Sequence, residues 1–434
     1  MSSSDVSYSV HNSPAALQRL RKRKAKETRF RMYGRAAIGF AMLSLLWLIL
    51  SLVSTGYSAF TQNFITLDIT FEASVLDPKG ENTPEALRRG DYQNIINTAL
   101  QKRLLQTATQ SNNRELLSLV SVSGAAQGLR NRLTQDPTLL GETLTIGVPT
   151  SDEVDQFLKG NIKKDTPEIR RKISNAQIIW VETLNKNGQI MSKFNTAFFT
   201  GTDSQDAELA GIAGAMIGSL MLLSIAFIIA VPIGIGAAIY LDEFAPKTRW
   251  TDMIEININN LAAVPSVIFG LLGLAFFLNF IGLPRSAPLV GGMVLALRAF
   301  PTITIATRGA LRAVPPSITE GALSVGASHV QAVFHHKLPL AAPGILTGTI
   351  ISMALILGET APLLMIGMVA FMTEIPTSIL EPATALPVQI FLWSDSAERA
   401  WTERTAAAVI ILLCILMTMN AFAIWLRYRL EQRR

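Results

Sequence analysis

Six long apolar stretches divide the chain, and each is close to or above the roughly 20 residues that an α-helix needs to cross a bilayer. They cover residues 36–57, 209–240, 257–282, 288–307, 340–372 and 405–426. The second and the fifth are longer than one straight crossing requires and contain Pro232 and Pro362, so we expect kinks or breaks there. The pattern predicts an α-helical polytopic membrane protein with six transmembrane helices.

Residues 58–207, between the first two apolar stretches, follow a different pattern. ITLDITFEA, which begins at Ile65, alternates apolar and polar residues as a strand does, whereas DYQNIINTALQKRLLQ and SDEVDQFLKGNI have helical spacing. AQIIWVETLNKNGQIMSKF predicts a hairpin that turns at Asn187-Gly188. We therefore expect a small α+β domain inserted after the first transmembrane helix.

Composition and charge refine this picture. Of the 434 residues, 49% are hydrophobic and only 16% are charged, which favours a membrane protein. The net charge of +6 is concentrated in residues 1–35, where nine Lys or Arg oppose Asp5 and Glu27. A basic cluster directly before a transmembrane helix is more typical of a cytoplasmic tail than of a nucleic-acid-binding patch.

The tail and the six crossings together predict the topology. Residues 1–35 would be a cytoplasmic tail, 36–57 the first helix, 58–207 an extracytoplasmic domain, 208–427 the remaining transmembrane domain, and 428–434 a cytoplasmic C-terminus. This arrangement places residues 308–339 in the cytoplasm as a loop.

The sequence disfavours several kinds of chemistry. Neither the four histidines nor the single cysteine, Cys414, lies within residues 58–207, which argues against zinc or Cys/His catalysis there. The chain contains no G-x-x-x-x-G-K-[ST] segment that would hold ATP phosphates. We expect no catalytic residues, no metal site and no cofactor, and any ATP-driven step must come from a partner chain.

The cytoplasmic loop contains the segment EGALSVGASHVQAVFHHKLPL, from Glu320 to Leu340. Ser317, which follows two prolines, is a candidate helix cap with Glu320 three residues later, and Ser328 is a candidate cap for a second helix that Leu338-Pro339 would end. The two short helices would meet at Gly326-Ala327. They could dock on a soluble partner or lie on the bilayer as an amphipathic loop, and local reasoning leaves both open.

This segment also has the spacing of a known motif. Glu320-Gly321-Ala322, Gly326 and Leu338-Pro339 match the E-A-A-x3-G-x9-I-x-L-P loop of ABC importer permeases, so the chain resembles that family. In the family this loop docks into a cleft on the ATPase subunit, which implies the same role here. The chain departs from the motif at Gly321, which replaces Ala, and at His336, which replaces Ile.

Further segments make the resemblance more specific. PIGIGAAIYLDEFAP, NLAAVPSVIFGLLGL, LGETAPLLMIG and LPVQIFLW, within residues 232–393, are similar to the A-type permeases of phosphate ABC importers, in the subset with an additional extracytoplasmic domain. The resemblance implies a multi-pass protein of the bacterial inner membrane, with both termini cytoplasmic, that transports inorganic phosphate. The implied partners are a second permease, ATP-binding cassette subunits and an extracytoplasmic phosphate-binding protein. A permease for another oxyanion or small solute, and a six-span sensor or scaffold, remain alternatives.

Charges within the apolar stretches are candidates for the translocation pathway, because a charge in a bilayer is costly. Arg298 and Arg308, together with Arg312, fall within an arc of about 80° on one helix, and guanidinium suits a tetrahedral oxyanion. Arg308 could instead be a marker of cytoplasmic orientation. The resemblance also places Glu359 in the translocation region, although Glu359 could simply form a structural ion pair with an arginine. The adjacent Thr360 could add a hydroxyl to either role.

Overall fold

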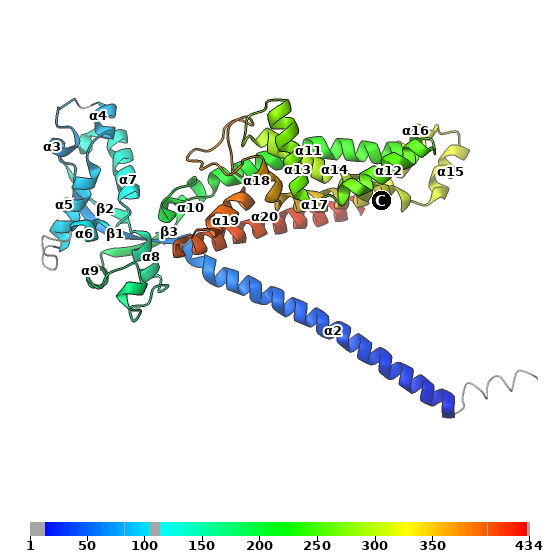
Figure 1. Ribbon diagram of the computed structural model, residues 1–434, viewed down its shortest axis with the longest axis horizontal. Helices are drawn as coiled ribbons and strands as arrows, with labels where there is room; N and C mark the ends of the chain where they lie inside the picture. Colours follow the sequence, from blue (N-terminus) through cyan, green and yellow to red (C-terminus); the bar gives the residue numbers. More distant parts are fainter. Residues whose placement is uncertain (1–13, 82, 105–112, 397, 432–434) are drawn as a thin grey trace, which may run out of the picture. The chain divides into compact units, whose positions relative to one another are not determined.

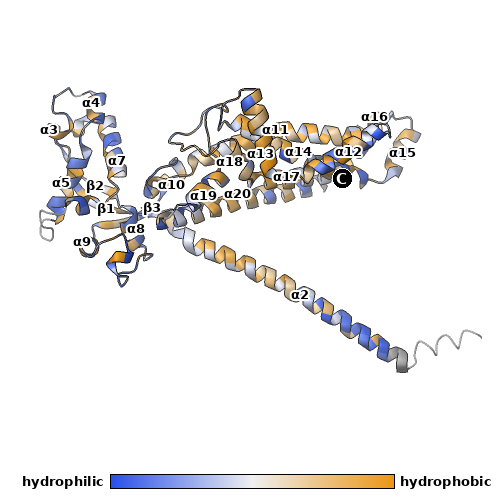
Figure 2. Ribbon diagram, in the orientation of Figure 1, coloured by the Kyte–Doolittle hydropathy of each residue, from blue (hydrophilic) through white to orange (hydrophobic). Residues whose placement is uncertain are grey.

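The computed structural model describes residues 14–81, 83–104, 113–396 and 398–431 (Figure 1). The chain divides into two units, residues 1–54 and 55–434. The first unit is dominated by α2 (Pro14–Gly56), a single helix of 43 residues whose first half is hydrophilic and whose second half is hydrophobic (Figure 2). Residues 14–35 of the basic tail are therefore continuous with the first predicted span in one helix.

A three-stranded antiparallel sheet organises residues 58–207, which we call the inserted domain. The strands are β1 (Thr61–Thr70), β2 (Thr143–Pro149) and β3 (Ile190–Phe194), in the order β2-β1-β3. The predicted strand is thus confirmed as the centre of the sheet. Ile65, Leu67 and Ile69 are completely buried, because alternate residues of a strand point to the same face.

The predicted hairpin at Asn187-Gly188 is wrong, because its first arm is a helix, α9 (Asn175–Lys186). Ser174 and Gln177 form a capping box that starts this helix. Ile178, Val181 and Leu184 are buried along one side of it, at the helical spacing of three residues. Of the predicted hairpin, only the second arm is a strand, β3.

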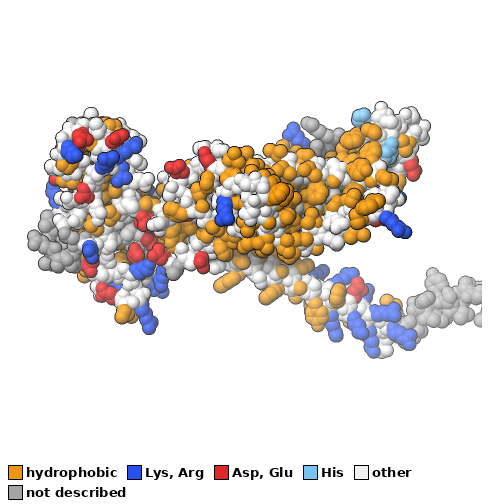
Figure 3. All heavy atoms as spheres, turned by 45° about the horizontal axis from the view of Figure 1, so that its top comes forward, with side chains coloured by type: hydrophobic (Ala, Val, Ile, Leu, Met, Phe, Trp, Pro, Cys, Tyr) orange, Lys and Arg blue, Asp and Glu red, His pale blue; other side chains and the backbone are white. Residues whose placement is uncertain are grey.

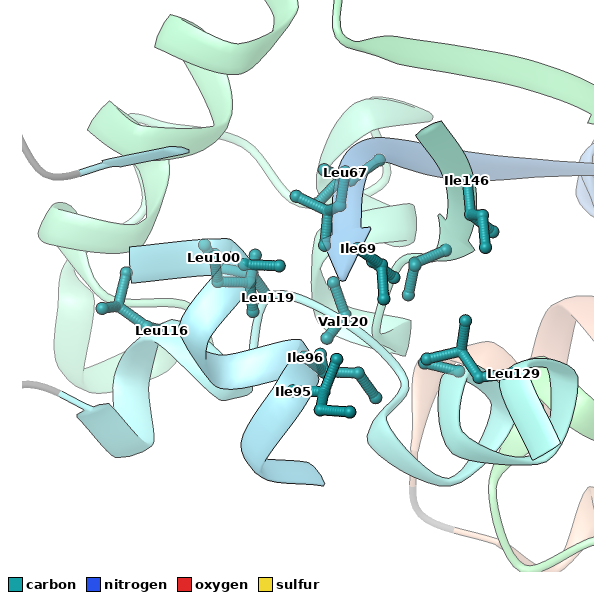
Figure 4. Close-up of a cluster of buried hydrophobic side chains, with 14 of the residues drawn as sticks. Leu67, Ile69, Ile95, Ile96, Leu100, Leu116, Leu119, Val120, Leu129 and Ile146 are labelled. Carbon is teal, nitrogen blue, oxygen red and sulfur yellow. The ribbon is translucent and has the colours of Figure 1, made fainter. Parts of the chain in front are cut away.

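Most helices of the inserted domain pack with the sheet in one hydrophobic core (Figure 4), whereas Phe198 of α10 belongs to a separate cluster with α19 and α20. Helical spacing predicted α5 and α8 correctly within the described residues. The α-helices are α3 (Ala73–Leu76), α4 (Pro84–Arg88), α5 (Tyr92–Leu104), α6 (Asn113–Leu117), α7 (Val122–Gln135), α8 (Asp152–Leu158), α9 and α10 (Thr196–Thr200). Short 3-10 helices cover Tyr57–Phe60, Pro137–Leu139, Glu168–Arg170 and Ala207–Leu209.

Long apolar helices make up the rest of the chain and carry a broad hydrophobic surface (Figure 3). Within the described residues, five helices are long and apolar enough to cross a membrane, or six if one bent pair counts as a span. After α2, the α-helices are α11 (Ala213–Ile239), α12 (Arg249–Ala262), α13 (Ser266–Gly273), α14 (Pro288–Arg312), α15 (Pro316–Ser324), α16 (His329–Gln331), α17 (Leu338–Leu357), α18 (Ala361–Met365), α19 (Leu386–Ser394) and α20 (Arg399–Glu431). π-helical segments cover Tyr240–Phe244, Leu274–Phe280 and Ala332–Lys337.

Two predicted spans differ from straight helices. The third bends by 102° between α12 and α13, directly before Ser266, where Pro265 precedes the second helix. The fifth, predicted over residues 340–372, is not one helix, because α17 ends at Leu357 and the short α18 follows the break at residues 358–360. Pro362, at the start of α18, cannot continue the hydrogen bonding of the preceding helix.

Small residues bring the central helices together. α11 packs along α14, and α14 packs along α17. A Cβ added to Gly348 would collide with the Cβ of Ala306, so glycine permits the close approach of α17 to α14. α14 is consequently the most enclosed of the candidate spans, and Thr304, Thr307 and Arg308 are among its buried residues.

Candidate functional site

The predicted loop forms two helical segments that meet at a sharp turn. Gly326 has a φ of +93°, in the region that favours glycine. Its N–H donates to the carbonyl of Leu323 at 3.0 Å, and the N–H of Ala327 donates to the carbonyl of Ala322 at 3.1 Å. These bonds end α15 in a glycine-containing cap, so the predicted meeting point at Gly326-Ala327 is confirmed.

The two predicted caps have different outcomes. Ser328 is confirmed as the cap of the second segment, where it and Gln331 form a capping box. Ser317 is not a cap, because α15 begins one residue earlier, at Pro316, and Pro315 occupies the cap position. A proline at the first helical position has its φ already fixed for the helix, which explains the earlier start.

The second segment also continues beyond its predicted end at Leu338-Pro339. The π-helical residues Ala332–Lys337 lead directly into α17, and Pro339 lies in the first turn of that helix. A π-helical turn inserts an extra residue into the helix and changes its hydrogen bonding locally, which lets the helix pass a proline. The loop is therefore built onto the end of a membrane-spanning helix.

The loop has a buried side and an exposed side. Ala322 and Val333 are buried, and Val333 packs with residues of α11, α14 and α17. Glu320, Gly321 and His336 are exposed. Exposed apolar side chains lie on the same loop, namely Leu323, Val325, Val330 and Phe334. His336 therefore adds an imidazole to an exposed, partly apolar surface.

The π-helical end of α11 holds this loop in place. Lys337 Nζ lies 2.6 Å from Glu243 Oε1, and His329 Nε2 lies 2.8 Å from the Glu243 carbonyl. The imidazole of His329 also meets the ring of Phe244 edge-on, at 5.3 Å between centroids. Sequence reasoning had not singled out Glu243, although two adjacent acids at the end of an apolar run were a visible signal.

The neighbouring acid, Asp242, binds the end of α14. Arg308 Nε lies 2.8 Å from Asp242 Oδ1, and Arg312 Nη2 lies 2.8 Å from the same oxygen. A second carboxylate, Glu255 of α12, lies 2.6 Å from Arg308 Nη2. The face of α14 that was expected to be basic as far as Arg312 is thus neutralised at this end.

The middle of α14 carries a different ion pair. Arg298 Nε lies 3.6 Å from Glu359 Oε1, which is longer than a hydrogen bond. Each side chain is 16% exposed, and within the described residues the buried Nε of Arg298 has no hydrogen-bond partner. Glu359 and Thr360 lie at the break between α17 and α18, and Thr360 makes no capping hydrogen bond there. The structure therefore brings Arg298 and Glu359 together and holds Arg308 apart from them.

This arrangement offers an oxyanion one loosely held guanidinium. Such a group can form paired hydrogen bonds with a tetrahedral anion, and the carboxylate beside it maintains its charge balance when no anion is present. Within the described residues, no three His, Cys, Asp or Glu side chains are grouped so as to hold a metal ion. What Arg298 and Glu359 can supply here is charge recognition.

Two regions of the chain are similar to known protein families. A family model described as "Binding-protein-dependent transport system inner membrane component" matches residues 230–434, and another described as "Domain of unknown function (DUF3333)" matches residues 17–168. The probable ABC transporter permease protein YqgI of Bacillus subtilis is 30% identical over 252 residues, which cover 54% of this chain and 84% of the relative. The phosphate transport system permease protein PstA of Yersinia pestis is 31% identical over 249 residues, which cover 57% of this chain and 82% of the relative.

Solved structures include a similar chain in the methionine ABC transporter MetNI. It has 16% sequence identity and a TM-score of 0.41, over 50% of this chain and 95% of the other.

Proposed function

This chain belongs to the PstA family of ABC importer permeases, and we propose that it moves inorganic phosphate across the bacterial inner membrane as one permease subunit of such an importer. It is a multi-pass membrane protein. ATP hydrolysis would belong to separate ATP-binding cassette subunits. A second permease and an extracytoplasmic phosphate-binding protein would complete the assembly.

The Arg298–Glu359 pair is the observation that supports phosphate as the cargo most directly. Phosphate could replace the Glu359 carboxylate as the partner of Arg298, since both are oxyanions and the existing contact of 3.6 Å includes no hydrogen bond. When phosphate leaves, Glu359 would again balance the arginine, and no buried charge would stay unpaired. We assign Arg308 a structural role instead, because two carboxylates already hold it.

The loop from Glu320 to Pro339 would couple this site to the ATPase subunits. Its exposed side offers Glu320 and the apolar side chains around the Gly326 turn to a cleft on the partner. Its anchors, Lys337–Glu243 to α11 and the Asp242–Arg308 pair between α11 and α14, would carry movement into the membrane. Alternating access would follow when the ATPase subunits pull on this loop.

The proposed orientation places the inserted domain outside and both ends of the chain in the cytoplasm. The basic half of α2 and the arginines at the end of α20 support this, because cytoplasmic ends of spans are enriched in Lys and Arg. If the bent pair α12–α13 counts as one span, six crossings would also bring the two ends to the same side.

Uptake of radiolabelled phosphate in a strain that lacks its own phosphate importers tests this function. The complete transporter should restore uptake, and excess unlabelled phosphate should suppress it more strongly than sulfate. Arg298→Gln should reduce uptake by about 10- to 100-fold, since a hydrogen bond to a charged group contributes about 1.5–3 kcal/mol. Arg285→Gln, at an exposed arginine outside the helices, is the matched control. Full uptake with Arg298→Gln would refute the site, and no phosphate uptake by the intact transporter would refute the cargo.

A further inference from the structure

A buried polar network joins the inserted domain to the start of α20. Lys159, just after α8, lies 2.6 Å from Asp155 Oδ2 and 2.8 Å from Glu403 Oε1. All three side chains are at most 8% exposed. Gln156 also donates a hydrogen bond to Glu403. A cationic side chain of the domain is thus enclosed between a carboxylate of its own helix and one of α20.

Arg404, the next residue of α20, extends this network. It is buried, and it donates to the carbonyl of Ala210 at 3.2 Å and to that of Glu208 at 3.1 Å. Its guanidinium also lies over the ring of Phe198, 5.6 Å from the centroid. α20 therefore binds the segment that connects the inserted domain to α11.

Two more contacts surround the network. Arg399 Nη1 donates to the carbonyl of Asn161 at 3.0 Å, and Lys172 Nζ lies 2.9 Å from Glu398 Oε1. The chain itself connects the domain to α2 and α11, so α20 is a third helix to which the domain is attached. Together these contacts attach the domain to the start of α20.

A cleft of about 220 Å³ opens beside these contacts, between the inserted domain and the start of α20. Acidic and basic side chains gather in this part of the surface (Figure 3). Gln156 lines the cleft and also belongs to the network. Asp152, at the start of α8, lines it as well, and among the described residues its carboxyl has no hydrogen-bond or ion-pair partner.

Charges from every adjoining segment face Asp152. The carboxylates are Glu153 and Asp155 of its own helix, Glu208 before α11, and Glu398 before α20. The basic groups are Lys172, Arg170 and Arg171 of the domain, with Arg399 and Arg404 of α20. Lys172 is already paired with Glu398, and Arg399 and Arg404 are bound to carbonyls. Arg171 donates to the carbonyl of Lys164 and to Asn175, and Arg170 is exposed. Among the described residues, Asp152 therefore lies among carboxylates without a cation paired to it.

We propose that the inserted domain and α20 form a proton-controlled clamp, in which a protonated Asp152 holds the domain docked on α20 and an ionised Asp152 loosens it. Ionisation places another negative charge in a cleft already bordered by Glu153 and Glu398. The domain can relieve this repulsion by moving off α20, which opens the cleft to water. The Lys159–Glu403 contact must then break, together with the other contacts that join the domain to the start of α20.

The electrostatics of the cleft support this direction. Burial first, and then the neighbouring carboxylates, raise the pKa of Asp152 from 3.8 to about 7. Burial also raises the pKa of Glu208. Separation from α20 would return the pKa of Asp152 toward its ordinary value, so the docked state binds this proton more tightly. Docking therefore strengthens as pH falls, with the change spread between about pH 4 and about pH 7 and little change above that range.

The clamp is placed to influence the helices that carry the proposed pathway. α20 packs against α17 and α19, and α17 ends at the break that carries Glu359. A change in how the domain sits on α20 would thus reach the break through packed helices. This consequence for transport rests on the proposed function and orientation, whereas the clamp itself does not.

Distances between two spin labels on the purified full-length chain test the clamp directly. One label would replace Ile179, exposed on α9, and the other Thr402, exposed on α20, in a Cys414→Ser background that removes the exposed cysteine. We expect one narrow distance distribution at pH 5 and a broader, longer one at pH 8. The docking equilibrium should change at least about tenfold, which corresponds to one pKa unit between the two states.

Variants separate this mechanism from general effects of pH. Asp152→Asn should keep the narrow distribution at both pH values, while Asp165→Asn, at an exposed aspartate of the same domain, should respond as the unmodified chain does. Circular dichroism at both pH values would verify that the domain is folded. Identical distributions at pH 5 and pH 8, or a full response in Asp152→Asn, would overturn the proposal. Because no transport is measured, the outcome is independent of whether the chain carries phosphate.

Discussion

Two regions of α14 carry arginine ion pairs of opposite character. In the middle of the helix, Arg298 has one carboxylate at 3.6 Å, and both side chains are 16% exposed. At its end, Arg308 has two carboxylates within 2.8 Å, and its side chain is 8% exposed. The guanidinium is the same in both, so the difference lies in how many partners each arginine has and how closely they approach.

The comparison separates a group that can bind a ligand from one that holds the fold. A tightly paired arginine must lose its carboxylates before it can bind an anion, which is costly in a buried setting. A loosely paired one can exchange its partner at small cost. Arginine is therefore a candidate anion-binding group in the middle of α14, whereas at the end of α14 it stabilises the packing of α11, α12 and α14.

Arg308→Met should produce the largest effect, a loss of stability. It would leave Asp242 with only the exposed Arg312 and would remove the counter-ion of Glu255, and breaking a buried pair in this way costs about 3–5 kcal/mol. The free energy of unfolding of the purified protein in detergent measures this. Arg308→Lys should recover part of the loss, because one ammonium can still pair with one carboxylate. A loss of less than about 1 kcal/mol in the free energy of unfolding would show that the ion pairs of Arg308 do not hold these helices together.

Glu359→Gln should have a smaller effect, and mainly on transport. Glutamine keeps the shape of the side chain but removes the charge that competes with phosphate for Arg298. We expect initial uptake to change by about tenfold, which is 1.4 kcal/mol, while stability changes by about 1 kcal/mol or less because the 3.6 Å contact includes no hydrogen bond.

Glu255→Gln is the matched control for that substitution, since it alters the other arginine of α14. It should lower stability and leave the uptake per folded transporter unchanged. If Glu359→Gln and Glu255→Gln affected uptake and stability alike, the two regions would not differ in the way that the distances indicate.

The sequence predicted the broad architecture because its signals are local. Apolar runs of membrane-spanning length predicted the helices, and alternation predicted β1. The spacing from Glu320 to Pro339 predicted a loop that turns at Gly326, where φ is positive. These features depend on neighbouring residues in the chain, which the sequence displays directly.

Other features depend on contacts between distant residues. The capping box of Ser174 and the buried face of α9 decided between helix and hairpin, and the π-helical segment before α17 let the helix pass Pro339. The Arg308–Asp242 contact joins residues 66 positions apart, so no spacing along one helix could reveal that the basic face is neutralised. The partner of Glu359 was likewise foreseen only as an arginine, without its position.

Arg312→Met should have the smallest effect, although Arg312 binds the same carboxylate as Arg308. Its side chain is 64% exposed, and exposed ion pairs contribute about 0–1 kcal/mol. This small loss should nearly vanish in about 1 M salt, where the screening length is about 3 Å, whereas the loss from Arg308→Met should persist. Because both arginines share Asp242, the double substitution should not equal the sum of the two single effects. Additive losses would mean that Asp242 pairs with them independently, and would weaken the contrast between the enclosed arginine and the exposed one.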